Sequence, residues 1–163
     1  MTIQEFNTCV DLYADGLYRF VLKHVTDKDV AKDLVQDTYE KLWVKVNDLE
    51  SKNAKSYMFT TAYHTTIDYL RRAKKSERLS FEKHGEQAEK ENTSYDLKSL
   101  LNKALDLLPE VQKSVVLLRD YEGYDYKEIG NITGLSESQV KVYIFRARQA
   151  LKEYLVKAEV SVS

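Results

Sequence analysis

The stretch DYKEIGNITGLSESQVKVYIFRARQAL, residues 125–151, has the layout of a helix-turn-helix. Gly134 lies where the first helix must stop and the backbone must turn through a left-handed conformation, which glycine tolerates best. Ser136 followed by Gln139 forms a capping box, so a second helix is expected to begin there. Apolar residues recur at helical spacing along it and predict its buried side: Val140, Ile144, Ala147, Leu151 and Leu155.

The opposite side of this second helix is basic and also carries two apolar side chains. It comprises Ser138, Lys141, Val142, Phe145, Arg146, Arg148 and Gln149. Such a helix can lie in the major groove of DNA, where Lys and Arg contact phosphates or guanine edges. Contact with a thymine methyl group would explain the outward Val142 and Phe145. An ordinary helical hairpin with a solvated basic face is the alternative.

Helices are expected in the rest of the chain as well. Helical spacing of apolar residues predicts three of them, at about 3–25, 28–49 and 53–74, with Thr26 or Asp27 capping the second. Residues 76–94 show no sustained apolar period and are interpreted as a linker. Further helices are predicted at about 97–108, 110–121, 125–133 and 136–157. The fold class is therefore all-α, with small helical domains at 1–75 and 95–163.

Composition excludes several other classes of protein. The chain has 163 residues, of which 43% are apolar and 31% charged, so it can bury a core. Five glycines and one proline are too few for a barrel of many short strands. Its apolar runs all fall short of the roughly 20 residues that span a bilayer, so no membrane insertion is expected and the location is predicted to be cytoplasmic.

No feature of the sequence favours an enzyme. The three histidines, His24, His64 and His84, are not spaced as a metal site, and there is no glycine-rich phosphate loop. Cys9 is the one cysteine, which excludes an internal disulfide, and its position in an amphipathic helix favours an inert buried thiol. We therefore expect no catalytic residue, no metal and no cofactor.

The net charge of −1 conceals two basic segments. Residues 51–78 carry 7 basic and 2 acidic side chains, and residues 141–157 carry 5 basic and one acidic. The first of these segments alternates cations with aromatic residues: Tyr57, Phe59, Tyr63, Tyr69, Arg71, Arg72, Lys74 and Lys75. Aromatic rings can stack on unpaired bases while cations follow the phosphates. The alternative is that the tyrosines are partly core and that the cations complement a helix C-terminus.

Taken together, the two halves resemble a bacterial RNA polymerase sigma factor of the extracytoplasmic-function (ECF) type. Three stretches carry the resemblance: DVAKDLVQDTYEKLWVKV (29–46), SYMFTTAYHTTIDYLRRAK (56–74) and the helix-turn-helix at 125–151. The segment LLPEVQKSVVLLRDYEG (107–123) leads into the last of them. The resemblance implies a promoter-melting domain and a helix-turn-helix domain, with core RNA polymerase, promoter DNA and an anti-sigma protein as partners.

The resemblance also implies a role for each stretch. The first would dock on core polymerase through Asp33, Gln36, Asp37, Tyr39, Glu40 and Trp43. The second would capture single-stranded DNA of the −10 element through Tyr57, Tyr63, His64, Arg71, Arg72, Lys74 and Lys75. The third would read the −35 duplex through Tyr126, Ser138, Gln139, Lys141, Val142, Phe145, Arg146 and Arg148.

This sequence departs from the family pattern at two places. Tyr63-His64 stands where many relatives carry Arg-Asn, and Val142-Tyr143 stands where Ser-Arg is more frequent. Both departures fall on positions expected to contact DNA, so this chain is expected to prefer a different promoter sequence from those relatives. A stand-alone helix-turn-helix regulator is the alternative function, and it predicts DNA binding to a palindromic operator without polymerase.

Overall fold

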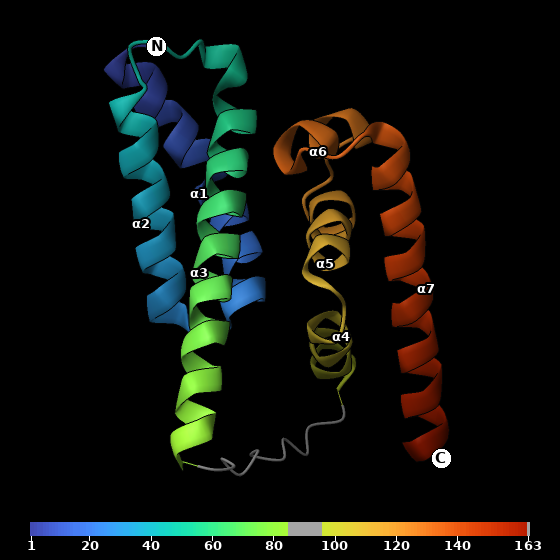
Figure 1. Ribbon diagram of the computed structural model, residues 1–163. Helices are drawn as coiled ribbons and strands as arrows, with labels where there is room; N and C mark the ends of the chain where they lie inside the picture. Colours follow the sequence, from blue (N-terminus) through green and yellow to red (C-terminus); the bar gives the residue numbers. More distant parts are fainter. Residues whose placement is uncertain (85–95, 163) are drawn as a thin grey trace.

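The computed structural model describes residues 1–84 and 96–162, and every regular element within them is helical. The first domain consists of α1 (Ile3–Val25), α2 (Lys28–Val44), the short 3-10 helix η1 (Ser51–Asn53) and α3 (Ala54–His84). The second consists of α4 (Leu97–Asp106), α5 (Glu110–Val116), the π-helical turn η2 (Leu117–Tyr121), α6 (Tyr126–Thr133) and α7 (Glu137–Val162). Figure 1 shows the two domains side by side.

Local capping accounts for where most of these helices begin. The Thr2 hydroxyl accepts a hydrogen bond from the backbone N–H of Glu5, and the Glu5 carboxylate accepts one from the N–H of Thr2, so a capping box starts α1. The carboxylates of Asp27, Asp96 and Asp125 cap α2, α4 and α6 in the same general way. The N-terminal ammonium group donates to Val46 O and Leu49 O, which holds the start of α1 against the turn after α2.

The expected core residues are buried almost throughout. Leu17, Phe20 and Val21 of α1 face Leu42 of α2 and Met58 of α3, and all are 1% exposed or less. Ile3 has the helical spacing of these apolar residues but is 64% exposed. It is the first residue of α1, and Phe6 in the next turn makes the contact with α2 instead, with its ring 5.1 Å from that of Trp43.

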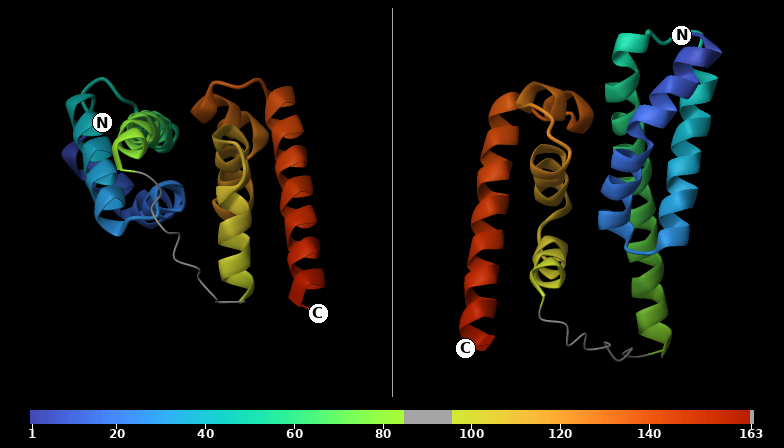
Figure 2. Two further views of the ribbon diagram at one scale, coloured as in Figure 1. Left: turned by 60° about the horizontal axis from the view of Figure 1, so that its bottom comes forward. Right: turned by 180° about the vertical axis from the view of Figure 1, so that it is seen from behind.

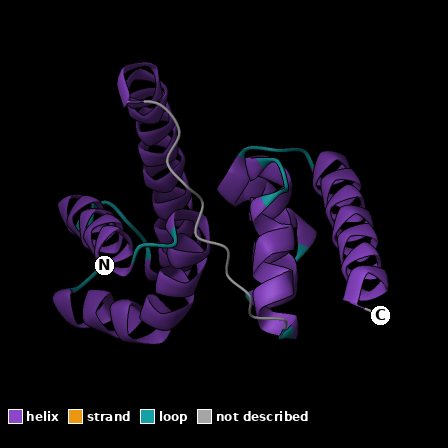
Figure 3. Ribbon diagram, turned by 90° about the horizontal axis from the view of Figure 1, so that it is seen from below, coloured by secondary structure: helices purple, strands orange, loops and turns teal. Residues whose placement is uncertain are grey.

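In the second domain α7 packs along α4, α5 and α6. Figures 2 and 3 show this arrangement from other sides, with α5 lying between α7 and the first domain. Buried residues of both domains belong to one continuous hydrophobic cluster. This cluster sets the relative position of the two faces that the sequence marks as functional.

Three helices differ by about five residues or more from their predicted bounds, and one of them, α7, continues to Val162 although it was expected to end near residue 157. The helix expected to end near residue 74 continues to His84, so residues 76–84 of the predicted linker are helical. They contain no glycine or proline, and a helix does not stop merely because its apolar period ends. The rest of the predicted linker, up to residue 94, lies outside the described residues. The helix expected at 28–49 ends at Val44 and is followed by turns.

Candidate nucleic-acid interface

The helix-turn-helix is built by α6, a turn at Gly134 and α7. Gly134 has φ 79°, and its N–H donates to Gly130 O at 2.8 Å, which closes α6 as predicted. A Cβ atom at Gly130 would lie 2.8 Å from Leu135 O, so the turn also requires glycine there. Ser136 Oγ accepts from the N–H of Gln139 at 3.1 Å, and Gln139 Oε1 accepts from the N–H of Ser136 at 3.0 Å. The predicted capping box is therefore confirmed.

The exposed side of α7 matches the prediction. Its buried side matches over residues 140–147, whereas Leu151 and Leu155 are only half-buried. Val140, Ile144 and Ala147 are 2% exposed or less. The opposite side is exposed and includes Ser138, Gln139, Lys141, Val142, Phe145, Arg146 and Arg148. Phe145 is 70% exposed and Val142 is 45% exposed, which is unusual for apolar side chains of a packed helix. This surface combines free apolar groups with cations, as a groove-binding helix requires.

Several cations on this face are held by neighbours. The Tyr126 ring lies 4.7 Å from the Arg119 guanidinium and 5.4 Å from Lys141 Nζ, so one aromatic face orients two positive charges. Arg148 Nε donates to Asp120 Oδ2 at 3.0 Å, and a second hydrogen bond joins the same two groups. Arg148 would have to leave Asp120 to reach a phosphate, whereas no ion pair with another described residue holds Arg146 or Lys141.

The predicted single-strand face of α3 is only partly accessible. His64 is exposed and stands edge-on to the Tyr63 ring at 5.3 Å, and Tyr57 is half-buried. Tyr63 is 8% exposed, and burial raises the pKa of its phenol, with opposing smaller effects of Arg71 and Glu110. Phe59 is 1% exposed and packs against Phe20 and Tyr124, so its expected place among the base-stacking rings is wrong.

The cations at the end of α3 are fully accessible. Arg71, Arg72, Lys74 and Lys75 are exposed, and Arg71, Lys74 and Lys75 line a shallow hollow together with Arg78 and Leu79. Arg78 was missed by the sequence analysis because the helix was expected to end before it. Continued helical spacing from Arg71 and Lys74 is the signal that could have found it.

The outward face of α2 is acidic and bears one large aromatic residue. Asp33, Gln36, Asp37 and Glu40 are exposed, and Tyr39 is half-buried. Trp43 is 46% exposed although its ring stacks edge-on against Phe6, and Val44 beside it is 76% exposed. A half-exposed Trp among carboxylates is typical of a protein-binding surface.

Other kinds of site find no support in the described part of the chain. It holds no group of three or more His, Cys, Asp or Glu side chains placed to bind a metal ion. None of its helices combines the length and hydrophobicity needed to cross a membrane. Cys9 is 7% exposed, and burial followed by the charge of Glu5 raises the pKa of its thiol, so the expected buried thiol is confirmed.

Comparison with known proteins identifies both domains. The family model for sigma-70 region 2 matches residues 9–76, and that for sigma-70 region 4 matches residues 98–151. The ECF RNA polymerase sigma factor SigM of Bacillus subtilis is 30% identical over 156 residues, which cover 93% of this chain and 94% of that protein. The chain belongs to the ECF sigma factors of the sigma-70 family.

Further relatives and solved structures agree with this assignment. The RNA polymerase sigma factor SigV of Bacillus subtilis is 29% identical over 160 residues, covering 94% of this chain and 93% of SigV. The sigma factor RpoE of Bartonella quintana, solved in complex with the anti-sigma factor NepR, matches with a TM-score of 0.77 and 27% identity, covering 94% of this chain and 98% of RpoE. CnrH, solved with the cytosolic domain of CnrY, shares the fold, with a TM-score of 0.70 at 21% identity.

The matched regions of the sigma factor coincide with the candidate surfaces. Region 2 contains the acidic face of α2 and the basic part of α3 up to Lys75, and region 4 contains the exposed face of α7. The chain functions as an RNA polymerase sigma factor, and the stand-alone regulator is not favoured.

Proposed function

We propose that this sigma factor binds core RNA polymerase through α2 and directs initiation at promoters that it reads through α7 and α3. It acts in the interior of the cell and carries out no covalent chemistry. The observation that supports this most strongly is the exposed face of α7, where Lys141 and Arg146 flank the apolar Val142 and Phe145. Of the described surfaces, this one combines phosphate-binding cations with side chains suited to base edges.

In the proposed mechanism α7 binds the −35 duplex. Lys141 and Arg146 contact phosphates or guanine edges, and Ser138, Val142 and Phe145 contact neighbouring bases. Gln139 and Arg148 have protein partners in this structure, the Ser136 backbone and Asp120. Tyr126 holds Lys141 in place through its ring and can contact a phosphate through its hydroxyl.

The −10 element is proposed to bind along α3. The cations Arg71, Arg72, Lys74, Lys75 and Arg78 follow the phosphates of the separated strand, while His64, Tyr57 and Tyr63 stack on or hydrogen-bond to its bases. Capturing bases that leave the stack turns transient opening into a stable bubble, because unstacking costs only a few kcal/mol per step.

The acidic face of α2 is the proposed docking surface for core polymerase. Trp43 supplies an apolar anchor, and Asp33, Asp37 and Glu40 meet basic residues of the partner, with Gln36 and Tyr39 between them. We also propose an anti-sigma protein as a partner, since RpoE and CnrH were each solved in complex with another protein, NepR and CnrY.

Gel filtration with purified bacterial core RNA polymerase tests this function. Co-elution of the chain with core polymerase, and specific promoter binding only by the complex, are expected. Tight and specific duplex binding by the chain alone, with no association with polymerase, would instead identify the stand-alone regulator.

A further inference from the structure

The two domains contact each other through α1 and α3 on one side and through α4, α5, η2, α6 and the loop before α6 on the other. Arg19 Nε and Nη2 donate to the two carboxylate oxygens of Glu122 at 3.2 and 2.9 Å. The Phe59 ring of α3 lies 5.0 Å from the Tyr124 ring, and Lys55 Nζ lies 4.2 Å from the centre of that ring and 3.5 Å from Glu128 Oε2. The views in Figures 1 and 2 agree on this side-by-side packing.

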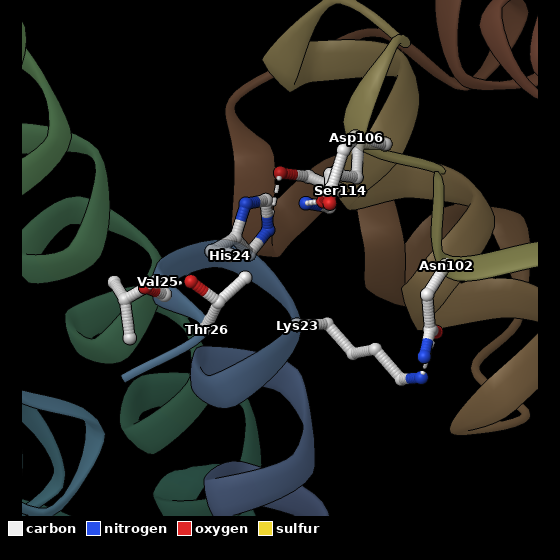
Figure 4. Close-up of polar contacts among 8 residues, drawn as sticks. Lys23, His24, Val25, Thr26, Asn102, Asp106 and Ser114 are labelled. Atoms are coloured by element: carbon white, nitrogen blue, oxygen red, sulfur yellow. Dashed lines mark hydrogen bonds and ion pairs between the residues drawn. The ribbon is translucent and has the colours of Figure 1, made fainter. Parts of the chain in front are cut away.

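His24 lies in the last turn of α1, where α1 meets α5. Figure 4 shows its ring directed at Ser114 of α5, with Nε2 and Oγ 3.2 Å apart. His24 is 7% exposed and Ser114 is fully buried. The second ring nitrogen, Nδ1, is buried without a hydrogen-bond partner. A doubly protonated ring would therefore bury one N–H group with no acceptor.

The charged groups around His24 are predominantly cationic. α5 contributes Lys113, which is 6% exposed and bound to Asp106 Oδ1 of α4 at 2.8 Å. α1 contributes Lys23, which donates to Asn102 of α4. Lys98 of α4 also lies near enough to lower the pKa of Lys23, after the larger effect of burial. Asp106 is already engaged by Lys113, so none of the ion pairs among residues 1–84 and 96–162 gives His24 a counter-charge.

The closed arrangement also covers part of the proposed −10 surface. Tyr63 is 8% exposed, and the Glu110 carboxylate at the start of α5 lies close enough to contribute to the raised pKa of its phenol, after burial. The Tyr124 ring packs edge-on against Phe59, one turn before Tyr63 in α3. Separation of the domains would remove the Tyr124 ring from Phe59 and the Glu110 carboxylate from the surroundings of Tyr63.

We propose that His24 is a proton-sensitive latch: the neutral ring holds the two domains together, and its protonation separates them and frees the side of α3 that bears Tyr63. The latch itself depends only on the domain contact. Its consequence for DNA binding rests on the proposed function.

The direction of the pH dependence follows from the burial of His24. Burial, and then the charge of Lys113, lower the pKa of His24 from 6.5 to about 3 in the closed form. In separated domains the ring returns to water and its pKa to about 6.5. Closure is therefore fully stabilised above pH 6.5 and is weakened as the pH falls below that value. The end of α1 favours a cation at His24 in both forms, so it does not alter this difference.

When the pH falls from 7.5 to 5.5, the equilibrium constant for closing of the domains should fall about tenfold. Distance measurement between spin labels tests it, one at the C-terminal end of α2 and one on α7, with Lys45→Cys and Lys152→Cys in a Cys9→Ala background. Both lysines are exposed and lie outside the domain contact. The ratio of long to short distances should rise about tenfold on acidification. The same ratio is measured with Arg19→Gln added, which loosens closure and populates both forms.

His24→Gln is the matched control, because Gln can still bond Ser114 but does not titrate. Its distance ratio should be the same at the two pH values. The latch is overturned if the distance ratio does not change with pH in the unaltered background or in the Arg19→Gln background. It is also overturned if the ratio changes as much in His24→Gln as in the chain with His24.

His24→Gln could open the domains at every pH, and it would then no longer serve as a control. In that case NMR titration of labelled histidine rings provides the test. The His24 ring should titrate together with the distance change, and separation while His24 stays neutral contradicts the proposal. These readouts contain no polymerase and no DNA, so failure of the latch leaves the proposed function standing. If the domains separate on acidification but the chain does not bind core polymerase, the latch stands and the proposed function fails.

Discussion

At the scale of single residues, the exposed side chains of α7 and α2 carry the proposed contacts. Arg146 has no hydrogen-bonded partner among those found for the described residues, and its guanidinium lies 5.9 Å from the centre of the Tyr143 ring. Trp43 is 46% exposed. Neither side chain fills a core, so substitution of either should weaken binding to its partner while the chain still folds.

Arg146→Ala should weaken binding of the −35 duplex by the polymerase complex at all sequences. Removal of one phosphate contact lowers the slope of log affinity against log salt by about 0.9. Affinity measured over a range of salt concentrations gives this slope. Lys152→Ala, which removes an exposed cation further along α7, is the control and should leave the slope unchanged. The same slope in Arg146→Ala and the unaltered chain would remove Arg146 from the interface.

Trp43→Ala should reduce affinity for core polymerase by about 2 kcal/mol, as for an interface anchor. Loss of the edge-on contact with Phe6 should lower stability by no more than about 1.5 kcal/mol. Binding to immobilised core polymerase and thermal unfolding measure the two effects. Leu12→Ala, at a 67% exposed apolar residue of α1, is the control and should bind normally. A large loss of stability with unchanged core affinity would make Trp43 a packing residue.

At the scale of elements, the turn between α6 and α7 fixes the angle of the reading helix. Gly130→Ala should destabilise the second domain by about 1–3 kcal/mol, because its Cβ atom would meet a backbone oxygen that cannot move freely. Thermal unfolding measures this loss. Asn131→Ala, at the exposed neighbouring position, should be close to neutral. Equal stability of the two variants would show that the turn relaxes around Gly130.

The sequence predicts elements well where the signal is local. The capping box at Ser136 and the stop at Gly134 depend on residues within a few positions of each other, and both are confirmed. The buried side of α7 is confirmed for its first three residues, while Leu151 and Leu155 are half-buried. The end of α3 was misplaced, since residues 76–84 remain helical without an apolar side to signal it. Arg78 was missed from the basic cluster for the same reason.

Contacts between distant segments leave no comparable signal. Nothing near Arg19 in the sequence indicates that it binds Glu122, and nothing near His24 indicates that Ser114 covers it. The burial of Tyr63 and Phe59 likewise depends on how one domain packs on the other. Periodicity could identify the aromatic residues of α3, but not which of them would be accessible.

At the scale of the whole molecule, the pair Arg19–Glu122 links the domains across 103 positions of sequence. Arg19→Glu and Glu122→Arg should each raise the population of separated domains, and the double variant should restore closure. The Arg19 side chain is 57% exposed but that of Glu122 only 5%, so Glu122→Arg should open the domains more than Arg19→Glu does. Distances between the spin labels measure it, with Lys52→Glu as a control outside the domain contact. Additive opening in the double variant would show that the pair does not couple the domains.

Transcription by core RNA polymerase from the genomic DNA that encodes this chain, with the chain present and absent, tests the proposed function most directly. Mapping of RNA 5′ ends should reveal start sites that require the chain and share two upstream motifs, one near −35 and one near −10. Trp43→Ala and Arg146→Ala should both reduce transcription from these sites. Start sites identical with and without the chain, under conditions where it binds core polymerase, would contradict a role in promoter selection.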